Sequence, residues 1–583
     1  MTLRQYALLA DGERGALVGP RGEIAFLCAP RWHDGAVFAS LVGGDGHYAV
    51  TPADDRFVWG GYYEPHSLVW RSRWVTTDGI IECREALAFP GEDHRLALLR
   101  RIEPVDTVAR LNVVLDLRAG FGSHRMESTR TDDGVWLGRS GPLHFRWQGA
   151  GEAVCREDRL ECLLTVAAGD HCDLILEISD RTLPDTAVSA DSAWGATVRA
   201  WSDSTPSLAD SLGPADVLHS RTVLRGLTSR HGGMVAAATT SLPERAEQGR
   251  NYDYRYSWIR DQCYAGQAAA VSGDAQLLHA AVGFVAHRLL EDGPQLKPAY
   301  TIDGGPVPEE RSLDLSGYPG GSDRVGNRVN RQFQLDAVGE ALLLFAAAAR
   351  SGALDDEGVA AARLAVEVIA ERWCHPDAGI WELGNRRWAH SRLIAAAGLQ
   401  ALAACGAAGA CAADPMTLAK AIVDDVDRDC THPTGRWQRS PDDERVDAAL
   451  LLPAIRGAVP YADPRSVATW RAVREQLGQD GYVYRFRQSE GSLEESEGAF
   501  LLCGFHMALA THQLGEAREA VRWFERNRAA TGPPGLYSEE YDVVQRQLRG
   551  NLPQAFVHAL LVESATRLAQ PPRAMAGIGE EEG

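Results

Sequence analysis

The second part of the chain contains twelve Ala- and Leu-rich segments in which apolar residues recur every three or four positions, and this repetition constrains the fold most strongly. The spacing predicts helices over 218–229, 258–272, 275–291, 330–351, 357–374, 390–405, 415–429, 445–457, 464–477, 497–513, 515–529 and 553–568. An even number of successive helices is typical of helical hairpins that close into a ring. We therefore expect an (α/α)6 barrel of six inner and six outer helices, with an open solenoid as the alternative.

The first third of the chain has a different pattern. Short runs of β-branched and large apolar residues, such as 24–28, 111–115 and 172–178, alternate with Gly-Asp, Asp-Gly and Pro-Gly pairs. This alternation is typical of an antiparallel β-sandwich. The predicted parts of the chain are a β-sandwich domain over 1–202, a linker over 203–217, the helical barrel over 218–570 and a flexible tail over 571–583.

The loops that precede every second helix are long and rich in Gly, aromatic and charged residues, whereas most other junctions are short. If the helices that follow these loops form the inner ring, the loops meet at one end of the barrel. That end is then the expected functional face. The loops contain Arg260-Asp261, 317–327, Gly379-Ile-Trp-Glu382, 436–447, 485–497 and Tyr537-Ser-Glu-Glu540.

Residues 250–261 combine four aromatic rings with five charged side chains just before a predicted helix. Flat apolar faces beside hydrogen-bonding charges are suited to hold a sugar ring and its hydroxyls. A surface helix with a highly charged N-terminus is the alternative interpretation of this segment taken alone.

Composition excludes several classes of function. The formal net charge of −20 disfavours nucleic acids and anionic membranes as partners, and no apolar run is long enough to span a bilayer. Lys297 and Lys420 are the only lysines, and the absence of a Gly-x-x-x-x-Gly-Lys loop argues against a P-loop nucleotide enzyme. Eleven cysteines without a Cys-x-x-Cys pair argue against a zinc knuckle or a disulfide framework. We expect no metal and no cofactor.

The N-terminal residues lack the apolar stretch of a secretory signal. We therefore expect a cytoplasmic protein.

Two glutamates in the loops of the predicted functional face are candidates for acid–base chemistry. Cleavage of a glycosidic bond with inversion needs an acid that protonates the leaving oxygen and a carboxylate that activates water, roughly 6.5–9.5 Å apart. Glu382 follows Ile380 and Trp381, an apolar setting that favours the protonated form, and it is the general-acid candidate. Glu539 is the base candidate, with Glu540 as its competitor. A solvated acidic pair is the alternative interpretation of residues 539 and 540.

Five segments in register resemble the family 15 glycoside hydrolases, the inverting glucoamylase-like family. The resemblance covers nearly the whole chain, because the runs 15–19 and 29–32 also match. The five segments are 251–261; Gly317-Tyr-Pro-Gly with 324–327 and Gln332-x-Gln-x-Asp336; Gly379-Ile-Trp-Glu382; 497–503; and Ser538-Glu-Glu with 550–556.

The resemblance implies that Arg260 and Asp261 hydrogen-bond the hydroxyls of a terminal glucosyl unit. It also implies that Tyr254 and Trp258 line this innermost subsite. In the same way it assigns Glu382 as the acid and Glu539 as the base. The remaining candidates for substrate contact are Arg324, Trp381, Arg485 and Glu540.

Three further polar residues on this face have structural interpretations. Glu497 is expected to be a carboxylate favoured by the dipole at the start of an inner helix rather than a catalytic group. Asp447 is expected to cap the eighth helix, with a position in the pocket as the alternative, and His390 is expected to be structural.

The chain departs from the family pattern at several positions near the site. Tyr252 stands where Trp is usual, Pro319 stands where Arg is often found, and Gln262-Cys-Tyr264 replaces small residues. We therefore expect altered recognition of the sugar on the leaving side, with the bond-breaking chemistry retained.

The sequence predicts an enzyme that takes a small oligosaccharide and removes a terminal glucose from it by one inverting displacement. The resemblance implies short maltooligosaccharides and isomaltose as the preferred substrates, with trehalose as a close alternative. Two other functions remain open, namely an inverting disaccharide phosphorylase on the same architecture and a non-catalytic glycan-binding protein. The retained acid and base argue against the binding protein.

Overall fold

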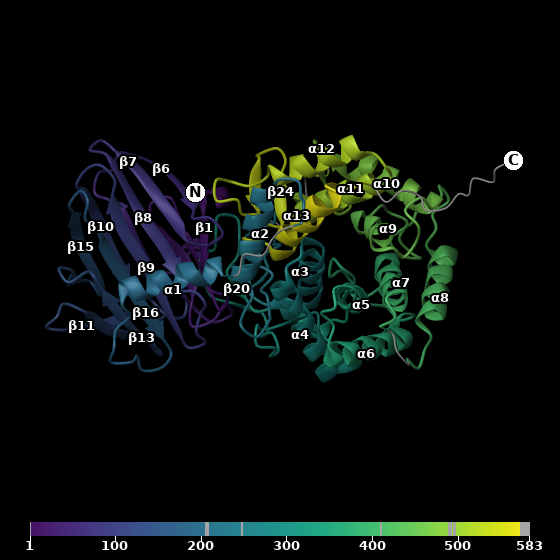
Figure 1. The fold of residues 1–583 in the computed structure, drawn as a ribbon, viewed down its shortest axis with the longest axis horizontal. Coiled ribbons are helices and arrows are strands. Elements are labelled where there is room, and N and C mark those ends of the chain that lie inside the picture. The colour runs from purple at the N-terminus through teal and green to yellow at the C-terminus, as the bar shows by residue number, and fades with distance from the viewer. Residues whose placement is uncertain are drawn as a thin grey trace.

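The computed structural model describes residues 2–203, 209–246, 249–407, 411–487, 493 and 497–571. The β-sheets lie on the left of Figure 1 and the helical domain lies on the right. Part of the predicted linker, 204–208, and most of the predicted tail, 572–583, lie outside the described residues.

Two antiparallel eight-stranded sheets form the β-sandwich. The first contains β1 (Ala7–Ala10), β2 (Gly15–Val18), β3 (Glu23–Cys28), β4 (Ala36–Phe38), β5 (His47–Pro52), β10 (Ala109–Asp116), β14 (Val154–Arg156) and β15 (Arg159–Val166). The second contains β6 (Phe57–Tyr63), β7 (Trp70–Thr76), β8 (Ile80–Leu87), β9 (Arg95–Pro104), β11 (Met126–Arg130), β12 (Trp136–Ser140), β13 (Leu143–Gln148) and β16 (Cys172–Ser179). Strand β10 illustrates the pattern, since Leu111, Val113 and Leu115 are buried while Arg110 and Asn112 are exposed.

The end of the predicted β-domain is a helix, α1 (Ala190–Ser202), which the sequence analysis did not predict. Its buried residues include Trp194 and Trp201, which are seven positions apart and therefore lie on one face. Trp201 stacks on Phe89, with ring centroids 3.9 Å apart. These aromatic contacts hold the helix against the sandwich.

The twelve predicted helices are all present, and six of them form a closed inner ring. The inner helices are α3 (Ile259–Ser272), α5 (Leu335–Arg350), α7 (Ala389–Ala404), the short α9 (Leu452–Arg456), α11 (Leu501–Gln513) and α13 (Ala555–Leu568). Each contacts the next, and the last, α13, contacts the first, α3. The predicted β-sandwich followed by an (α/α)6 barrel is confirmed, and the open solenoid is wrong.

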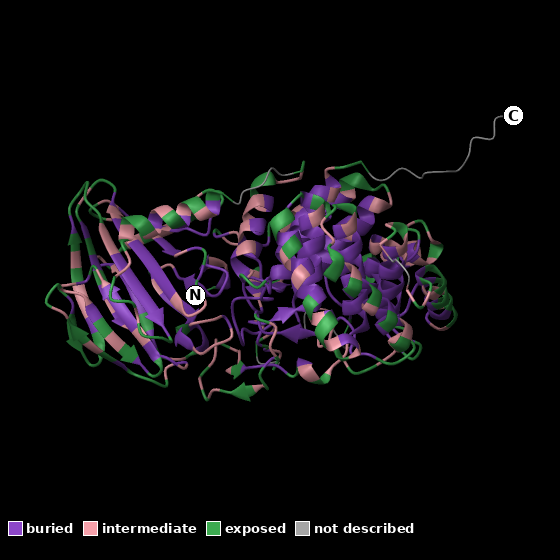
Figure 2. Cartoon of the chain, turned by 60° about the horizontal axis from the view of Figure 1, so that its bottom comes forward, coloured by how far each residue is buried: buried purple, intermediate pink, exposed green. Residues whose placement is uncertain are grey.

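The outer ring and several short strands complete the helical domain. The outer helices are α2 (Pro214–Leu227), α4 (Ala275–Asp292), α6 (Asp356–Arg372), α8 (Pro415–Asp429), α10 (Pro464–Leu477) and α12 (Ala517–Arg528). The strands are β17 (Ser257–Trp258), β18 (Ala299–Tyr300), β19 (Arg311–Ser312), β20 (Arg324–Val325), β21 (Gly478–Gln479), β22 (Tyr482–Val483), β23 (Ala499–Phe500), β24 (Glu540–Asp542) and β25 (Gln547–Arg549). Figure 2 shows that the centre of the helical domain is almost entirely buried.

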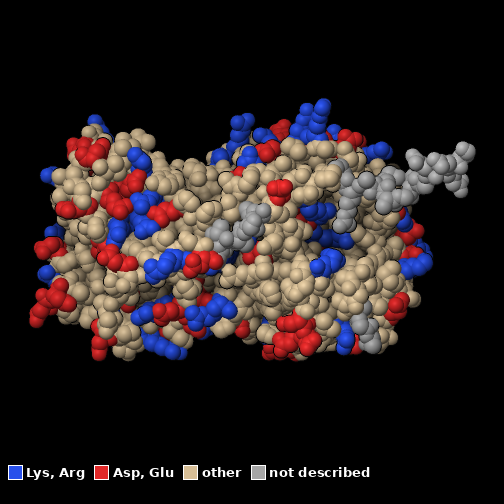
Figure 3. All heavy atoms as spheres, in the orientation of Figure 1, with Lys and Arg blue, Asp and Glu red and all other residues tan. Residues whose placement is uncertain are grey.

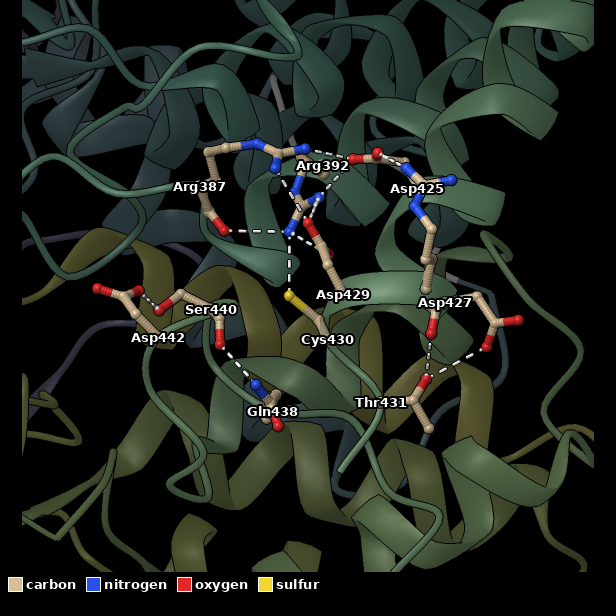
Figure 4. A network of polar contacts seen from close by, with 11 residues as sticks. Arg387, Arg392, Asp425, Asp427, Asp429, Cys430, Thr431, Gln438, Ser440 and Asp442 are labelled. Atoms are coloured by element: carbon tan, nitrogen blue, oxygen red, sulfur yellow. Dashed lines mark hydrogen bonds and ion pairs between the residues drawn. The ribbon is translucent and has the colours of Figure 1, made fainter. Parts of the chain in front are cut away.

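A network of ion pairs joins α8 to its inner neighbour α7 (Figure 4). Arg392 of α7 is 1% exposed and lies 2.7 Å from Asp425 and 3.1 Å from Asp429, both on α8. Its guanidinium also donates to the sulfur of Cys430 at 3.0 Å. Because a buried cation needs paired partners, this contact fixes the register of the two helices.

Arg255 connects the helical domain to the β-sandwich. It donates to the backbone carbonyls of Trp32, at 3.2 Å, and Asp34, at 2.9 Å, and to the sulfur of Cys28, at 3.1 Å. The segment that carries Arg255 is thereby anchored from the side of the β-domain.

On the face seen in Figure 3, acidic and basic side chains are interspersed over both domains. No helix in the described part of the chain has the length and apolar composition that crossing a lipid bilayer requires.

The backbones of α5 and α7 touch where two glycines face each other. A Cβ on Gly398 would lie 2.5 Å from the carbonyl oxygen of Gly339, and a Cβ on Gly339 would lie 2.7 Å from the amide of Ala395. The close approach of these inner helices therefore requires glycine at both positions.

We predict that Gly398→Ala lowers the free energy of unfolding by about 1–3 kcal/mol, because the added methyl group must push α5 and α7 apart. The matched control is Gly283→Ala in α4, where a Cβ would meet no atom within 4 Å. That change raises the free energy of unfolding by up to about 1 kcal/mol through helix propensity. Urea unfolding followed by circular dichroism measures both. Equal stability of the two variants would contradict the account of this crossing.

Candidate active site

A cavity of about 390 Å³ opens at the end of the barrel where the inner helices begin. This volume is in the range of pockets that bind small molecules. Nine of the ten sequence-predicted site residues line it, and the tenth, Glu540, is fully buried behind it. The nine are Tyr254, Trp258, Arg260, Asp261, Arg324, Trp381, Glu382, Arg485 and Glu539.

The run 252–255 is extended, so its side chains point alternately to opposite sides. Tyr252 and Tyr254 line the cavity and stack on each other, with ring centroids 6.1 Å apart. Asp253 and Arg255 point the other way and pair at 2.7 Å beside the β-domain. The tyrosines of this run therefore line the cavity, while its charged residues lie beside the β-domain.

Glu382 ends a tight turn whose backbone is strained. Its φ of 52° lies in the left-handed region, which costs a non-glycine residue about 1–2 kcal/mol. The amide of Gly379, which begins the turn, donates to Asp377 at 2.8 Å. The indole N–H of Trp258 donates to the Glu382 carboxylate at 2.8 Å. The half-buried carboxyl group of Glu382 therefore has Trp258 as a polar partner, in addition to its apolar neighbours in the sequence, Ile380 and Trp381.

Glu539 is 4% exposed and has one polar partner at the cavity wall. The phenol of Tyr254 donates to its Oε1 at 3.2 Å, while its buried Oε2 has no hydrogen-bond partner among the described residues. Burial raises the pKa of Glu539 well above its usual range, and the nearby Glu244 carboxylate adds to this shift. The tyrosine hydrogen bond opposes it.

One short segment holds both candidate catalytic carboxyl groups. Tyr254 holds Glu539 and Trp258 holds Glu382, and the two rings meet edge to face with centroids 5.4 Å apart. The acid and base candidates, far apart in the sequence, are therefore positioned against the same aromatic pair.

Arg260 and Asp261 lie side by side at the start of α3. The guanidinium of Arg260 donates to Gln334 at 2.7 Å and to Asp336 at 3.1 Å, which holds it in place. Burial raises the pKa of Asp261 to about 7, although the charge of Arg260 opposes the shift. Asp261 thus presents a desolvated carboxyl group to the cavity, suited to hydrogen bonds with the hydroxyls of a neutral ligand.

A cluster of carboxyl groups surrounds Arg485 at one side of the cavity. One nitrogen of Arg485, Nη2, lies 3.2 Å from Glu244, 2.6 Å from Glu497 and 3.3 Å from Glu540. Glu497 also lies 2.7 Å from Arg250. We call Glu244, Glu497, Glu539, Glu540 and their two arginines the carboxyl cluster.

The interpretation of Glu497 as a carboxylate at a helix start is wrong. The helix α11 begins only at Leu501, because the two-residue strand β23 (Ala499–Phe500) intervenes and pairs with β24. The role of Glu497 is to pair with the arginines of the carboxyl cluster. The predicted capping role of Asp447 is confirmed, since it accepts from the amide of Ala449 at 2.9 Å, and it also accepts from the indole of Trp381 at 2.9 Å.

The cavity mouth is polar and partly exposed. Arg324 and Arg328 both pair with Glu310 there. Tyr252 is 40% exposed at the same cavity. At the floor, the ring of Tyr264 is buried, and Arg456 lies 5.5 Å from its centroid. The departures from the family pattern at residues 252 and 264 therefore lie on the cavity wall.

Sequence reasoning missed Glu244, which is 3% exposed and lines the cavity. It lies in a loop after α2, preceded by Pro243, and belongs to no motif that we recognised. Its contact with Arg485, more than two hundred positions later, is a property of the folded chain alone.

Two carboxyl groups facing one cavity, with an arginine and an aspartate beside them, are equipped for acid–base chemistry on an uncharged polar molecule. Among the described residues, no group of three or more His, Cys, Asp or Glu side chains is arranged to hold a metal ion.

Comparison with protein families gives two matches along the chain. A model described as glycosyl hydrolases family 15 matches residues 218–566, and one described as trehalase-like, N-terminal, matches residues 1–190. The trehalase of Mycolicibacterium smegmatis is 28% identical over 625 residues, which cover 97% of this chain and 91% of that protein. Trehalase 1 of Sulfolobus acidocaldarius is 27% identical over 585 residues, which cover 96% of this chain and 98% of that protein.

Among solved structures, a bacterial glucoamylase complexed with acarbose matches with a TM-score of 0.71. The match covers 98% of this chain and 94% of the other, at 13% sequence identity. This likeness supports the two-domain fold.

The strained backbone of Glu382 leads to a stability prediction. We expect Glu382→Gly to be more stable than Glu382→Ala by about 1 kcal/mol, because glycine removes the left-handed strain and alanine retains it. Both variants lose the hydrogen bond from Trp258, so that loss cancels in the comparison. Urea unfolding curves measure the difference. Equal stability would show that the turn relaxes without strain.

Proposed function

The chain belongs to family 15 of the glycosyl hydrolases, and on this basis we propose that it hydrolyses trehalose to two glucose molecules by one inverting displacement. It is a glycoside hydrolase. The sequence analysis placed maltooligosaccharides and isomaltose ahead of trehalose. The two sequence relatives described above favour the opposite order, because both align over nearly the whole chain and are named trehalase, and the N-terminal match is described as trehalase-like.

The observation that carries the mechanism is the pair of carboxyl groups held by Tyr254 and Trp258 in one cavity. In the proposed reaction Glu382 gives its proton to the glycosidic oxygen as the bond from that oxygen to the anomeric carbon breaks. A water molecule attacks the same carbon from the opposite face and loses one proton to Glu539. Each turnover thus moves one proton onto the leaving sugar and one onto the base.

Tyr254 has a defined part in this step. Its phenol donates to Oε1 of Glu539 and so holds the carboxyl group in one orientation at the cavity wall. The hydrogen bond also favours the ionised form of the base, against the effect of burial.

We assign the terminal glucosyl unit to Arg260 and Asp261. Asp261 is desolvated and has no protein donor other than its own backbone among the described residues, so sugar hydroxyls can satisfy its oxygens. The leaving glucose then faces Tyr252, Arg324 and Arg328 at the mouth. A polar mouth suits a second, fully hydroxylated sugar ring.

We predict that Glu382→Gln and Glu539→Gln each lower kcat for trehalose by about 10²–10⁴-fold, because each removes one proton transfer. Glucose release from trehalose, maltose and isomaltose measures this, and trehalose is expected to be cleaved fastest. The matched control is Glu357→Gln on the outer helix α6, where the side chain is 65% exposed and pairs only with His287 among the contacts of the described residues.

Two results would contradict the proposal. Faster cleavage of maltose than of trehalose would restore the substrate order that the sequence suggested. Phosphate-dependent glucosyl transfer that survives Glu539→Gln would indicate a phosphorylase, since phosphate attack requires no base.

A further inference from the structure

The carboxyl cluster contains a pair of acids that the proposed mechanism does not use. Glu244 and Glu540 lie 3.2 Å and 3.3 Å from the same atom, Nη2 of Arg485. They are 3% and 0% exposed. Glu540 is held from the other side, because its Oε2 accepts from the amide of Gly498 at 2.7 Å. Both side chains are therefore fixed against one guanidinium.

Both carboxyl groups contact the same guanidinium nitrogen, so the two groups lie close together in a buried site. Two ionised carboxylates in such a site repel each other, and a proton on one of them removes this repulsion and allows a hydrogen bond between them. Burial raises the pKa of Glu244, and it raises the pKa of Glu540 well above its usual range. The geometry and the surroundings both favour a pair that holds one proton between two carboxyl groups.

The charges of the cluster agree with this assignment. Arg250 and Arg485 bring two positive charges, and Glu497 pairs with both. If Glu244, Glu539 and Glu540 were all ionised as well, four negative charges would face two positive ones in a buried site, at a high desolvation cost. The remaining titratable or charged groups around the cluster are Tyr252, Tyr254, Asp261 and Cys503.

Gly550 places the pair next to the proposed base. A Cβ at Gly550 would lie 3.6 Å from Oε2 of Glu539 and 3.8 Å from Cγ of Glu244. The side chain of Glu244 and the unpartnered oxygen of Glu539 thus face the same small space. A negative charge on the pair therefore acts on Glu539 at short range.

We propose that Glu244 and Glu540 form a carboxylic acid–carboxylate pair under Arg485 that shares one proton, and that this pair is a positioning element for the base Glu539. The pair keeps a single negative charge beside the base over the working pH range. That charge sets the pH below which Glu539 is protonated and inactive. The assignment of Glu539 as base rests on the function proposed above, whereas the shared proton does not.

The test compares three variants by the acidic limb of the pH profile of kcat/KM for trehalose. In Glu244→Gln or Glu540→Gln, the amide N–H replaces the shared proton and the other carboxylate keeps the charge. Each single change therefore shifts the limb by less than about 0.3 pH unit. The double variant removes the charge, so Glu539 ionises more easily and the limb moves to lower pH by about one unit or more.

The matched control is Glu357→Gln on the outer helix α6, which removes one exposed carboxylate outside the cavity. We expect the acidic limb of this variant to coincide with that of the wild type. Thermal melting of every variant shows whether it is folded.

If the two carboxyl groups titrate independently, each single variant should shift the acidic limb. If each single variant moves the limb by about half as much as the double variant, no proton is shared and the proposal is overturned. A double variant whose limb stays in place overturns it as well, because the pair then does not act on Glu539.

A direct titration tests the pair without any turnover. The protein is labelled with ¹³C at the glutamate carboxyl groups. The signals of Glu244 and Glu540 are assigned because each disappears in the corresponding variant, Glu244→Gln or Glu540→Gln. The pair should lose one proton in acid and keep the second beyond neutrality. Ionisation of both groups near the ordinary glutamate value of about 4.3 overturns the pair. Failure of the wild type to hydrolyse trehalose counts against the proposed function alone, since this titration still decides the pair.

Discussion

The active-site geometry depends on closure of the helical ring between its first and last inner helices. The amide of Ala555 at the start of α13 donates to the carbonyl of Ala236 at 2.8 Å, and the side chain of Asn551 donates to the carbonyl of Tyr252 at 2.8 Å. These contacts join segments about three hundred positions apart, and they bring Tyr254 within hydrogen-bonding distance of Glu539. Without closure, the proposed base Glu539 would not be held at a fixed distance from the aromatic pair Tyr254 and Trp258.

Burial of charge is the second constraint, and the site uses it in two ways. Around Asp261 and Glu539, desolvation favours the protonated carboxyl group. Around Arg485, opposite charges and a shared proton limit the cost of placing four carboxyl groups together. The β-sandwich contributes by anchoring Arg255, so the cavity wall is supported from both domains.

Much of this architecture could be predicted from the sequence, because helix periodicity is a local signal. The twelve helices and the loops of the functional face follow from it, and nine of the ten site residues line one cavity. Helix α1 was missed, since it is held by the stacking of Trp201 on Phe89, which lies far away in the sequence. Glu497 was misinterpreted because strand β23 forms only by pairing with distant β24. Glu244 carries no local signal at all, since its partner Arg485 lies far along the chain.

The central claim is that Glu382 and Glu539 cleave an α-glucosidic bond by one displacement with inversion. The anomeric configuration of the first products tests it most directly, by proton NMR of trehalose hydrolysis at times shorter than mutarotation. The glucose whose bond is broken is released as the β-anomer, whereas the leaving glucose keeps its α-configuration. The account therefore predicts equal amounts of α- and β-glucose at the start. Release of α-glucose alone would contradict it, because that outcome requires retention.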